Sequence, residues 1–318
     1  MPGPRPVVSR PCACVGGGNS ISGDSAGEAG DIAVWGAAEF TDMIPDMSQN
    51  PARAAFFDVD GTLTTSAGMF RFLAYYLAAT GRPRREYDER MREFKAMTAV
   101  GCPREATNRA YFAHLQGLDA GVVADVARAW FAAELATGAH YHRPALTELR
   151  RHQERGDHVV LVSGSFPALL APLAADLGVD DVRCTRPRID HGRYTGALDG
   201  PPMIGAAKSD AVMHVTIRAG IDPADCTAYG DHVSDLPMLN AVGTAYVVGG
   251  DAGLRSAARL RGWRFLPGTP PAPEPPLPHR GADRAAAFPP RTPFFSTPRD
   301  RGLTTAHTTA RYETREGA

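Results

Sequence analysis

The chain has 318 residues, of which 43% are hydrophobic and 22% charged, enough apolar material for at least one sizeable core. Its 34 basic and 35 acidic residues nearly cancel, so no overall field attracts nucleic acid or an anionic membrane, and we expect neither as a partner. The sequence contains no apolar run of the roughly 18 residues that a transmembrane helix needs. Only two of the basic residues are lysines, Lys95 and Lys208, which makes each of them informative.

Both ends of the chain have the composition of disordered tails. Residues 1–50 contain eight glycines and carry six acidic against two basic residues, and residues 267–318, rich in proline and arginine, hold 11 of the 27 prolines. Translation from Met43 or Met47, rather than from Met1, stays open because both stand just before the ordered pattern begins. The start of the chain lacks the apolar block of a secretory signal and the five cysteines are scattered, so we expect a cytoplasmic protein.

Between the tails, strand-like and helix-like segments alternate. Short apolar runs predict strands at 54–58, 159–162, 181–185, 226–229 and 245–248, with a hairpin around Gly192. Helical spacing predicts helices at 140–155, 166–177, 206–219, 237–241 and 252–260. This alternation predicts an α/β fold of the Rossmann-like, doubly wound type with a mainly parallel sheet.

One insertion interrupts the alternation after the first strand. It has helical spacing at 69–79, 84–97, 104–115 and 122–135 and contains no good strand. Beside the carboxyl edge of a parallel sheet, where ligands bind, such an insertion is well placed to act as a lid. We therefore expect an α/β core of residues 51–65 and 139–266, and a helical cap of residues 66–138.

The first predicted strand ends in two aspartates, Asp58 and Asp60. Residues two apart in an extended chain project to the same side, so both can face one site while Val59 turns away. Two carboxylates held this close repel each other unless a cation or a shared proton intervenes. Gly61 then permits a tight turn. Alone, this motif fits a surface turn as well as a functional site.

Two further strands end in polar residues. Ser163 and Gly164 lead into the predicted helix at 166, where a hydroxyl and a backbone amide suit an anion, unless a serine merely caps that helix. Asp231 and Asp235 follow the strand at 226–229, and hard carboxylate oxygens that converge from two strands suit Mg²⁺. The alternative for this pair is again a helix cap.

Lys208 lies in the first turn of the helix predicted at 206–219. A cation there opposes the helix dipole, which favours acidic residues in the first turn. In a chain that otherwise uses arginine, this position indicates a need for a compact point charge of the kind that binds phosphate. Lys95, on a helix of the insertion, has no such context and is expected to be solvated.

In this order, the four motifs resemble the motif set of the haloacid dehalogenase (HAD) superfamily of phosphohydrolases. The helical insertion between the first and second motifs, and the segments 162–164 and 235–239, are similar to the phosphoserine-phosphatase-like branch of that superfamily, the subfamily IB type. The resemblance covers about residues 53–266 and leaves out both tails.

The resemblance implies a role for each motif residue. Asp58 would be the nucleophile that becomes an aspartyl phosphate, and Asp60 the acid that protonates the leaving oxygen and then activates water. Mg²⁺ would be held by the Asp58 carboxylate, the Asp60 backbone carbonyl and Asp231, with Asp235 as a further acid. The phosphoryl oxygens would be held by Ser163, Gly164 and Lys208. The implied reaction is hydrolysis of a small phosphorylated metabolite.

The sequence departs from the phosphoserine phosphatases at positions that concern the substrate. Ala67 stands where they carry a glutamate for the substrate ammonium, Ser234 stands where they have asparagine, and His232 occupies a position that is usually small. Besides phosphoserine hydrolysis itself, a phosphotransferase or phosphomutase reaction and a non-catalytic binding role stay open. The candidates for contacting the leaving group are Arg71, Arg104, Arg109 and His114.

Overall fold

The computed structural model describes residues 51–270, 273–274 and 278. The predictions for the tail 1–50, for the translation start and for most of the tail 267–318 concern residues outside this range. The strands are β1 (Ala54–Phe57), β2 (His158–Ser163), β3 (Asp181–Cys184), β4 (Pro187–Asp190), β5 (Arg193–Leu198), β6 (Thr227–Gly230), β7 (Thr244–Val248) and β8 (Arg264–Leu266). The helices are α1 (Gly68–Ala79), α2 (Arg84–Ala99), α3 (Arg104–Ala113), α4 (Ala120–Ala136), α5 (Arg143–Glu154), α6 (Pro167–Leu177), α7 (Ala206–Ala219), α8 (Leu236–Asn240) and α9 (Ala252–Arg261).

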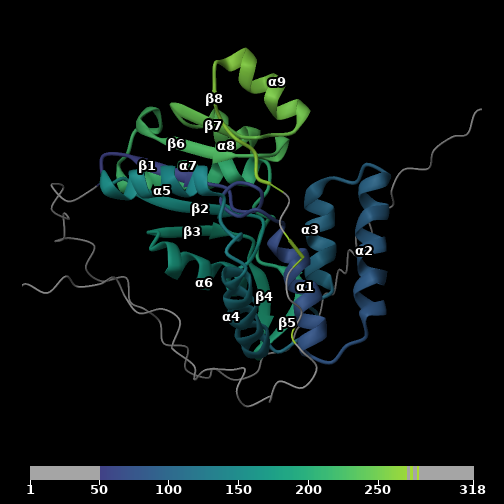
Figure 1. Ribbon diagram of the computed structural model, residues 1–318. Helices are drawn as coiled ribbons and strands as arrows, with labels where there is room; N and C mark the ends of the chain where they lie inside the picture. Colours follow the sequence, from purple (N-terminus) through teal and green to yellow (C-terminus); the bar gives the residue numbers. More distant parts are fainter. Residues whose placement is uncertain (1–50, 271–272, 275–277, 279–318) are drawn as a thin grey trace, which may run out of the picture.

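Six strands form one sheet in the order β3-β2-β1-β6-β7-β8, and every neighbouring pair is parallel (Figure 1). The chain proceeds from β1 to β2 and β3 on one side, and then returns to β6, β7 and β8 on the other. The strand order therefore reverses between β1 and β6, which confirms the doubly wound α/β fold. In such sheets the crevice at the reversal is where ligands bind.

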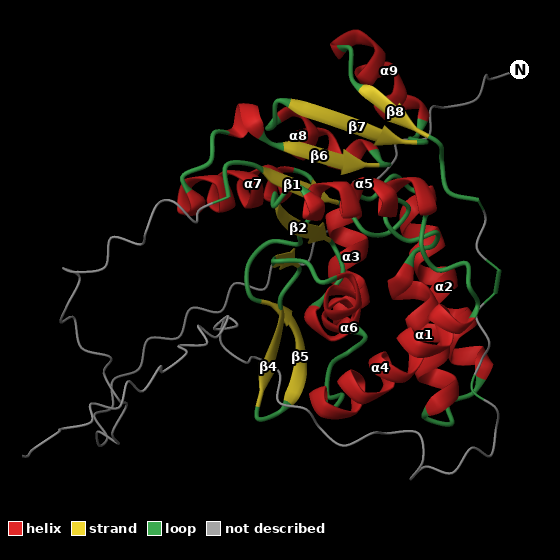
Figure 2. Cartoon of the chain, turned by 60° about the vertical axis from the view of Figure 1, so that its left-hand side comes forward, coloured by secondary structure: helices red, strands yellow, loops and turns green. Residues whose placement is uncertain are grey.

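Helices cover both faces of the sheet, because the side chains of a strand alternate between its two faces. Ala55 and Phe57 of β1 belong to a buried cluster that includes residues of α5 and α6. Ala54 and Phe56 belong to a second cluster with residues of α7, α8 and α9. Figure 2 shows the resulting layers of helix, sheet and helix.

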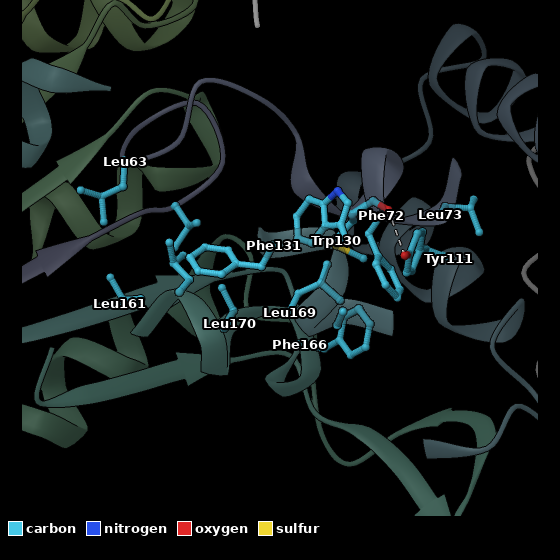
Figure 3. Packing of buried hydrophobic residues seen from close by; sticks show 14 of the residues in the cluster. Leu63, Phe72, Leu73, Tyr111, Trp130, Phe131, Leu161, Phe166, Leu169 and Leu170 are labelled. Carbon is cyan, nitrogen blue, oxygen red and sulfur yellow. Dashed lines mark hydrogen bonds between the residues drawn. The ribbon is translucent and has the colours of Figure 1, made fainter. Parts of the chain in front are cut away.

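Helices α1 to α4 fill the predicted insertion. In the view of Figure 1, α1, α2 and α3 stand to one side of the sheet. Figure 3 shows how this part joins the rest: the ring of Phe72 on α1 lies edge-on, 5.8 Å from that of Trp130 on α4 and 6.3 Å from that of Phe166 beside α6. The dashed line marks the bond from the Tyr111 hydroxyl to the Met69 carbonyl, 3.0 Å long. One continuous apolar cluster therefore links the insertion to the sheet.

The two chain segments that connect the insertion to the sheet run side by side. The Thr65 N–H donates to the His140 carbonyl at 3.0 Å, and the His142 N–H donates to the Leu63 carbonyl at 2.9 Å. Because residues 140–142 are used in this pairing, the helix predicted from residue 140 begins only at Arg143. The pairing brings the two ends of the insertion together at the loop that follows β1.

The remaining strands include a pair that was predicted and one that was not. The predicted hairpin around Gly192 is present as β4 and β5, and it contacts the insertion through the bond from the Tyr194 N–H to the Leu118 carbonyl, 3.0 Å long. Strand β8 was not predicted, because three residues at a sheet edge are too short to show a period of two.

Among the described residues, no helix combines the length and hydrophobicity of a membrane span.

Candidate active site

The loop after β1 brings the first predicted pair of acids to the carboxyl edge of the sheet. The Asp58 N–H donates to the Tyr229 carbonyl at 3.0 Å and so continues the pairing of β1 with β6. Val59 turns into the apolar core, as the alternation predicted. Gly61 has a φ of +88°, and a Cβ atom there would lie 2.4 Å from Oδ2 of Asp231. A glycine is therefore required for the two loops to approach each other.

A cavity of about 70 Å³ lies at the reversal of the strand order, between the sheet edge and the helical insertion. The loops after β1, β2 and β6, together with α7, supply the polar side of the cavity. The helical insertion supplies most of the opposite side. The lining residues are Asp58, Asp60, Met69, Arg104, Asn108, Gly164, Ile204, Lys208, Asp231, Ser234 and Asp235. Six of the seven residues singled out as site residues in the sequence thus meet in one place, although they come from four separate segments.

Lys208 is the cation of this cavity. Its side chain is only 4% exposed, and Nζ donates to Oδ1 of Asp58 and to Oδ1 of Asp235, both at 2.6 Å. Burial alone would lower the pKa of Lys208, but the two carboxylates outweigh that effect and raise it. The lysine therefore stays charged and partly neutralises the acids around it.

Three carboxylates converge beside the lysine. Oxygen atoms of Asp58, Asp231 and Asp235 all lie within 4.8 Å of one another. Burial and the neighbouring Asp58 and Asp235 carboxylates raise the pKa of Asp231 to about 8, and burial raises the pKa of Asp58 as well. This repulsion would fall if a divalent cation lay between the oxygens. A set of hard oxygen donors suits Mg²⁺.

Asp235 also organises its own loop. Its Oδ2 accepts hydrogen bonds from the N–H groups of Asp231, at 3.2 Å, and His232, at 3.0 Å. A Cβ atom on Gly230 would lie 2.7 Å from the Cβ of Asp235, so the glycine makes room for this arrangement. With Oδ1 on Lys208 and Oδ2 on the loop, Asp235 orients the groups around it, whereas Asp231 has fewer bonds of its own.

Asp60 is held by the first residue of α1. The Gly68 N–H, at the start of α1, donates to Oδ1 of Asp60 at 2.6 Å. Burial raises the pKa of Asp60 to about 6. A carboxyl group with such a pKa can give up and take back a proton near neutral pH, which is what general acid and base catalysis requires. The contribution of Gly68 was not predicted from sequence.

The loop after β2 contributes the backbone of Gly164, and not a serine hydroxyl, to the cavity wall. Gly164 lines the cavity, but Ser163 is buried behind it, with Oγ accepting the Ser165 N–H at 3.1 Å. Neither serine caps α6, whose N-cap is Phe166 without a side-chain bond. The alternative interpretation of these serines as a helix cap is therefore wrong.

The insertion places one of the four candidate leaving-group residues in the cavity. Arg104, at the start of α3, donates from Nη1 to Oγ of Ser234 at 3.3 Å and has no ion-pair partner among the residues the structure describes. Arg71 instead forms a buried ion pair with Glu134, at 2.8 Å. Neither Arg109 nor His114 lines the cavity, and His114 is bonded to Glu93.

Sequence reasoning missed three lining residues: Met69, Asn108 and Ile204. None of them carries a charge or belongs to a spaced motif. They reach the cavity only because the fold brings α1, α3 and the loop before α7 over the sheet edge. The helical spacing of the insertion could have placed Asn108 and Arg104 on one face of α3, since they are four residues apart.

A comparison with models of known protein families assigns this fold and cavity to one family. The model of the haloacid dehalogenase-like hydrolases matches residues 55–240, which is more than half of the chain. The chain therefore belongs to this family. Within the family it is phosphoserine-phosphatase-like, as the following relatives show.

A phosphoserine phosphatase of Halobacterium salinarum is 30% identical over 200 residues, which cover 59% of this chain and 82% of that protein. A probable phosphatase and a phosphoserine phosphatase of Mycobacterium tuberculosis are 39% and 40% identical over 36% of this chain. The matches cover 40% and 37% of these two mycobacterial proteins, so the chain spans well under half the length of either.

Solved structures share the fold. A protein of unknown function from Bordetella pertussis has a TM-score of 0.61 and 26% identity, over 68% of this chain and 98% of that one. A substrate-bound phosphoserine phosphatase has a TM-score of 0.50 and 19% identity, over 65% of this chain and 90% of that one.

Proposed function

We propose that the protein is a Mg²⁺-dependent phosphatase that hydrolyses a small organic phosphomonoester through an aspartyl phosphate on Asp58. The observation that carries the proposal is the buried contact of Lys208 with both Asp58 and Asp235, at 2.6 Å each, in a cavity that Asp60 and Asp231 also line. A carboxylate can attack a phosphate only where cations offset their mutual repulsion. The names of the relatives support the same reaction.

The residues of the cavity fit a magnesium ion. The Asp58 and Asp231 carboxylates would hold it together with the Asp60 backbone carbonyl, while Asp235 supports the loop and the lysine. When bound, the ion would draw charge from the phosphoryl oxygens and lower the repulsion between the substrate and the acids. The raised pKa values of Asp58 and Asp231 are consistent with carboxylates that require such a cation.

The reaction then needs only residues already described. An Asp58 carboxylate oxygen attacks phosphorus, the bond from phosphorus to the leaving oxygen breaks, and Asp60 gives its proton to that oxygen. Asp60, now ionised, takes a proton from water as the water oxygen attacks phosphorus and the bond to Asp58 breaks. Lys208 and the Gly164 amide would hold the phosphoryl oxygens through both steps. Free Asp58 and a protonated Asp60 are restored.

The helical insertion supports a substrate other than phosphoserine. Its contributions to the cavity wall are Met69, Arg104 and Asn108, with no acid among them, and Ala67 at the N-cap of α1 cannot hold an ammonium group. The Arg104 guanidinium instead offers donors to an anionic or polar leaving group. Phosphoserine hydrolysis stays the alternative, and the cytoplasmic location stays a prediction.

The test is phosphate release from p-nitrophenyl phosphate, with and without Mg²⁺. The Asp58→Asn variant should lose activity by about 10³-fold or more, because an amide cannot act as the nucleophile. The matched control is Asp88→Asn on an exposed part of α2, which should keep wild-type activity. Full activity of Asp58→Asn would exclude the proposed nucleophile. Formation of a phosphoenzyme that discharges faster to an added alcohol than to water would favour a phosphotransferase.

A further inference from the structure

The first turn of α1 begins beside the proposed general acid. The Gly68 N–H donates to Oδ1 of Asp60 at 2.6 Å, and Ala67, the N-cap residue of α1, offers the helix no side-chain cap. Oδ2 of Asp60 has no hydrogen-bond partner within the described part of the chain. Because Oδ1 already acts as an acceptor, a protonated Asp60 carries its proton on Oδ2. The Gly68 amide therefore determines which oxygen is left for the proton.

Gly68 has no room for a side chain beside Asp60. A Cβ atom at this residue would lie 3.1 Å from Oδ1 of Asp60 and 3.3 Å from Cη2 of Trp130 on α4, whose indole is drawn in Figure 3. The φ of Gly68 is not positive, so the close approach, and not the backbone conformation, requires the glycine here. The buried edge of the Trp130 ring thus closes the space next to both the carboxyl group and the first peptide of α1.

The Trp130 indole is itself held by a hydrogen bond. Its Nε1–H donates to Oε1 of Glu134, one turn further along α4, at 2.9 Å. Glu134 is 2% exposed and forms a bidentate ion pair with Arg71, at 2.9 and 2.8 Å. Since Arg71 follows Gly68 by three residues, this pair joins the first turn of α1 to the part of α4 that carries Trp130.

Packing alone does not account for a buried charge pair at this place. Replacing such a pair by apolar side chains of similar volume often leaves stability unchanged or raises it. A bidentate pair of arginine and carboxylate adds a fixed geometry instead. Because one carboxylate, that of Glu134, accepts from both Arg71 and Trp130, it fixes the indole and the helix turn relative to each other.

We propose that Trp130 is a positioning residue for the general acid. Held by Glu134, it closes the space beside Gly68, keeps the Gly68 N–H on Oδ1 of Asp60 and so directs Oδ2, with its proton, to the leaving oxygen. The inference rests on the proposed function, because it assumes that Asp60 protonates that oxygen. It concerns the transfer of the proton and requires no contact between Trp130 and the substrate.

The test compares two aryl esters that differ in their need for a proton. Phenol has a pKa of about 10, like tyrosine, so phenyl phosphate needs the acid, whereas p-nitrophenyl phosphate loses its leaving group without a proton. The quantity measured is kcat/KM, which reports the steps up to the phosphoenzyme. In Trp130→Phe it should fall by about tenfold for phenyl phosphate, and by less than about threefold for p-nitrophenyl phosphate, because a placed acid contributes roughly 10²–10⁴-fold.

Trp263→Phe is the matched control for this variant. It makes the same change at an indole that packs against the second apolar cluster, on the other face of the sheet, and lines none of the cavity. It should leave kcat/KM unchanged for both esters.

Gly68→Ala is a second variant, which fills the same space with one methyl group. Its matched control is Gly253→Ala in the first turn of α9, where a Cβ atom would lie 3.2 Å from Oδ1 of Asp251, a carboxylate that does not line the cavity. Neither glycine has a positive φ, so both variants gain similar helix propensity. Only Gly68→Ala should lower kcat/KM for phenyl phosphate relative to p-nitrophenyl phosphate.

Hydrogen exchange at the Gly68 amide tests the positioning without turnover. NMR of the full chain, labelled at glycine and without substrate, should show this amide protected in the wild type and in Trp263→Phe. In Trp130→Phe it should exchange about tenfold faster, because the first turn of α1 is no longer held.

An equal change, or no change, of kcat/KM for the two esters in the folded variants would overturn the inference. Unchanged exchange of the Gly68 amide in Trp130→Phe would overturn it too. Failure of the proposed function is seen separately, as a wild type that releases phosphate from neither ester. In that case the exchange measurement still decides whether Trp130 holds the Gly68 amide.

Discussion

Lys208 shows how far a single residue could be interpreted from sequence. Its position in the first turn of a helix, against the dipole, and the scarcity of lysine predicted a compact cation at a phosphate site. The structure adds what the sequence could not contain, namely that Nζ contacts Asp58 and Asp235, which lie 150 and 27 residues away. Lys95 is exposed, as expected.

Replacing the lysine should affect stability and activity together. In Lys208→Met, two buried carboxylates lose their counter-charge, which should cost about 3–5 kcal/mol in the free energy of unfolding. Phosphate release should fall by about 10²–10³-fold, because a charge that stabilises the transition state is gone. The measurements are urea unfolding and turnover of p-nitrophenyl phosphate. Lys95→Met, at the other lysine of the chain, is the control, and an equal effect of both would contradict the role of Lys208.

At the scale of elements, the loop after β1 is the segment in which a substitution should disturb the site most. Gly61 and Gly101 both have positive φ, +88° and +77°, but only a Cβ at Gly61 would meet Asp231, whereas a Cβ at Gly101 would meet nothing within 4 Å. Any alanine in this conformation is strained by roughly 1–2 kcal/mol. A comparison of alanine substitutions at the two glycines therefore distinguishes the effect of backbone strain from the effect of displacing the Asp231 carboxylate.

Gly61→Ala should accordingly lower activity, while Gly101→Ala should not. We expect both variants to have a lower unfolding midpoint, and Gly61→Ala alone to need a higher Mg²⁺ concentration for half-maximal activity, because Asp231 must move. Turnover as a function of Mg²⁺ concentration measures this. An unchanged Mg²⁺ dependence in Gly61→Ala would show that Asp231 does not depend on the close approach.

A second element-scale feature is the connection from α5 to β2, which depends on Asp157. Its carboxylate accepts hydrogen bonds from His152 at 2.7 Å, Arg53 at 2.9 Å and Arg155 at 3.1 Å, and His152 is in turn bonded to the Tyr229 hydroxyl of β6. Burial alone would raise the pKa of Asp157, but these three donors outweigh burial and lower it.

This lowered pKa predicts a loss of stability in acid. The contribution of Asp157 is present above its unfolded-state pKa and is lost as the pH falls through the folded-state value. We expect the free energy of unfolding to fall below about pH 4 in the wild type, and less steeply in Asp157→Asn, which should be the less stable protein at pH 7. Urea unfolding over a series of pH values tests this. Parallel curves for the two proteins would show that other acids cause the effect.

At the scale of the whole molecule, local patterns predicted most of the fold. Strand β2 is a continuous apolar run and helix α7 is long enough to show helical spacing, and the alternation of strands and helices predicted a mainly parallel sheet. The short β8 and the pairing of residues 140–142 with residues 63–65, in the loop after β1, depend on tertiary contacts and were missed. Likewise, Asn108 carries no chemical signature, and only the packing of α3 over the sheet edge reveals its contact with Gly164.

The sheet and the insertion meet at one cavity. The central claim is that a covalent intermediate, an aspartyl phosphate on Asp58, forms in that cavity. The most direct measurement is mass spectrometry of peptides from acid-quenched protein after brief reaction with a phosphomonoester and Mg²⁺. The Asp60→Asn variant should be used beside the wild type with p-nitrophenyl phosphate, whose leaving group departs without a proton, so that loss of the base slows only the discharge of the intermediate. We predict a phosphoryl group on the peptide that contains Asp58, with more of it in Asp60→Asn and none in Asp58→Asn. Turnover without phosphate on that peptide, or phosphate that persists in Asp58→Asn, would contradict the account.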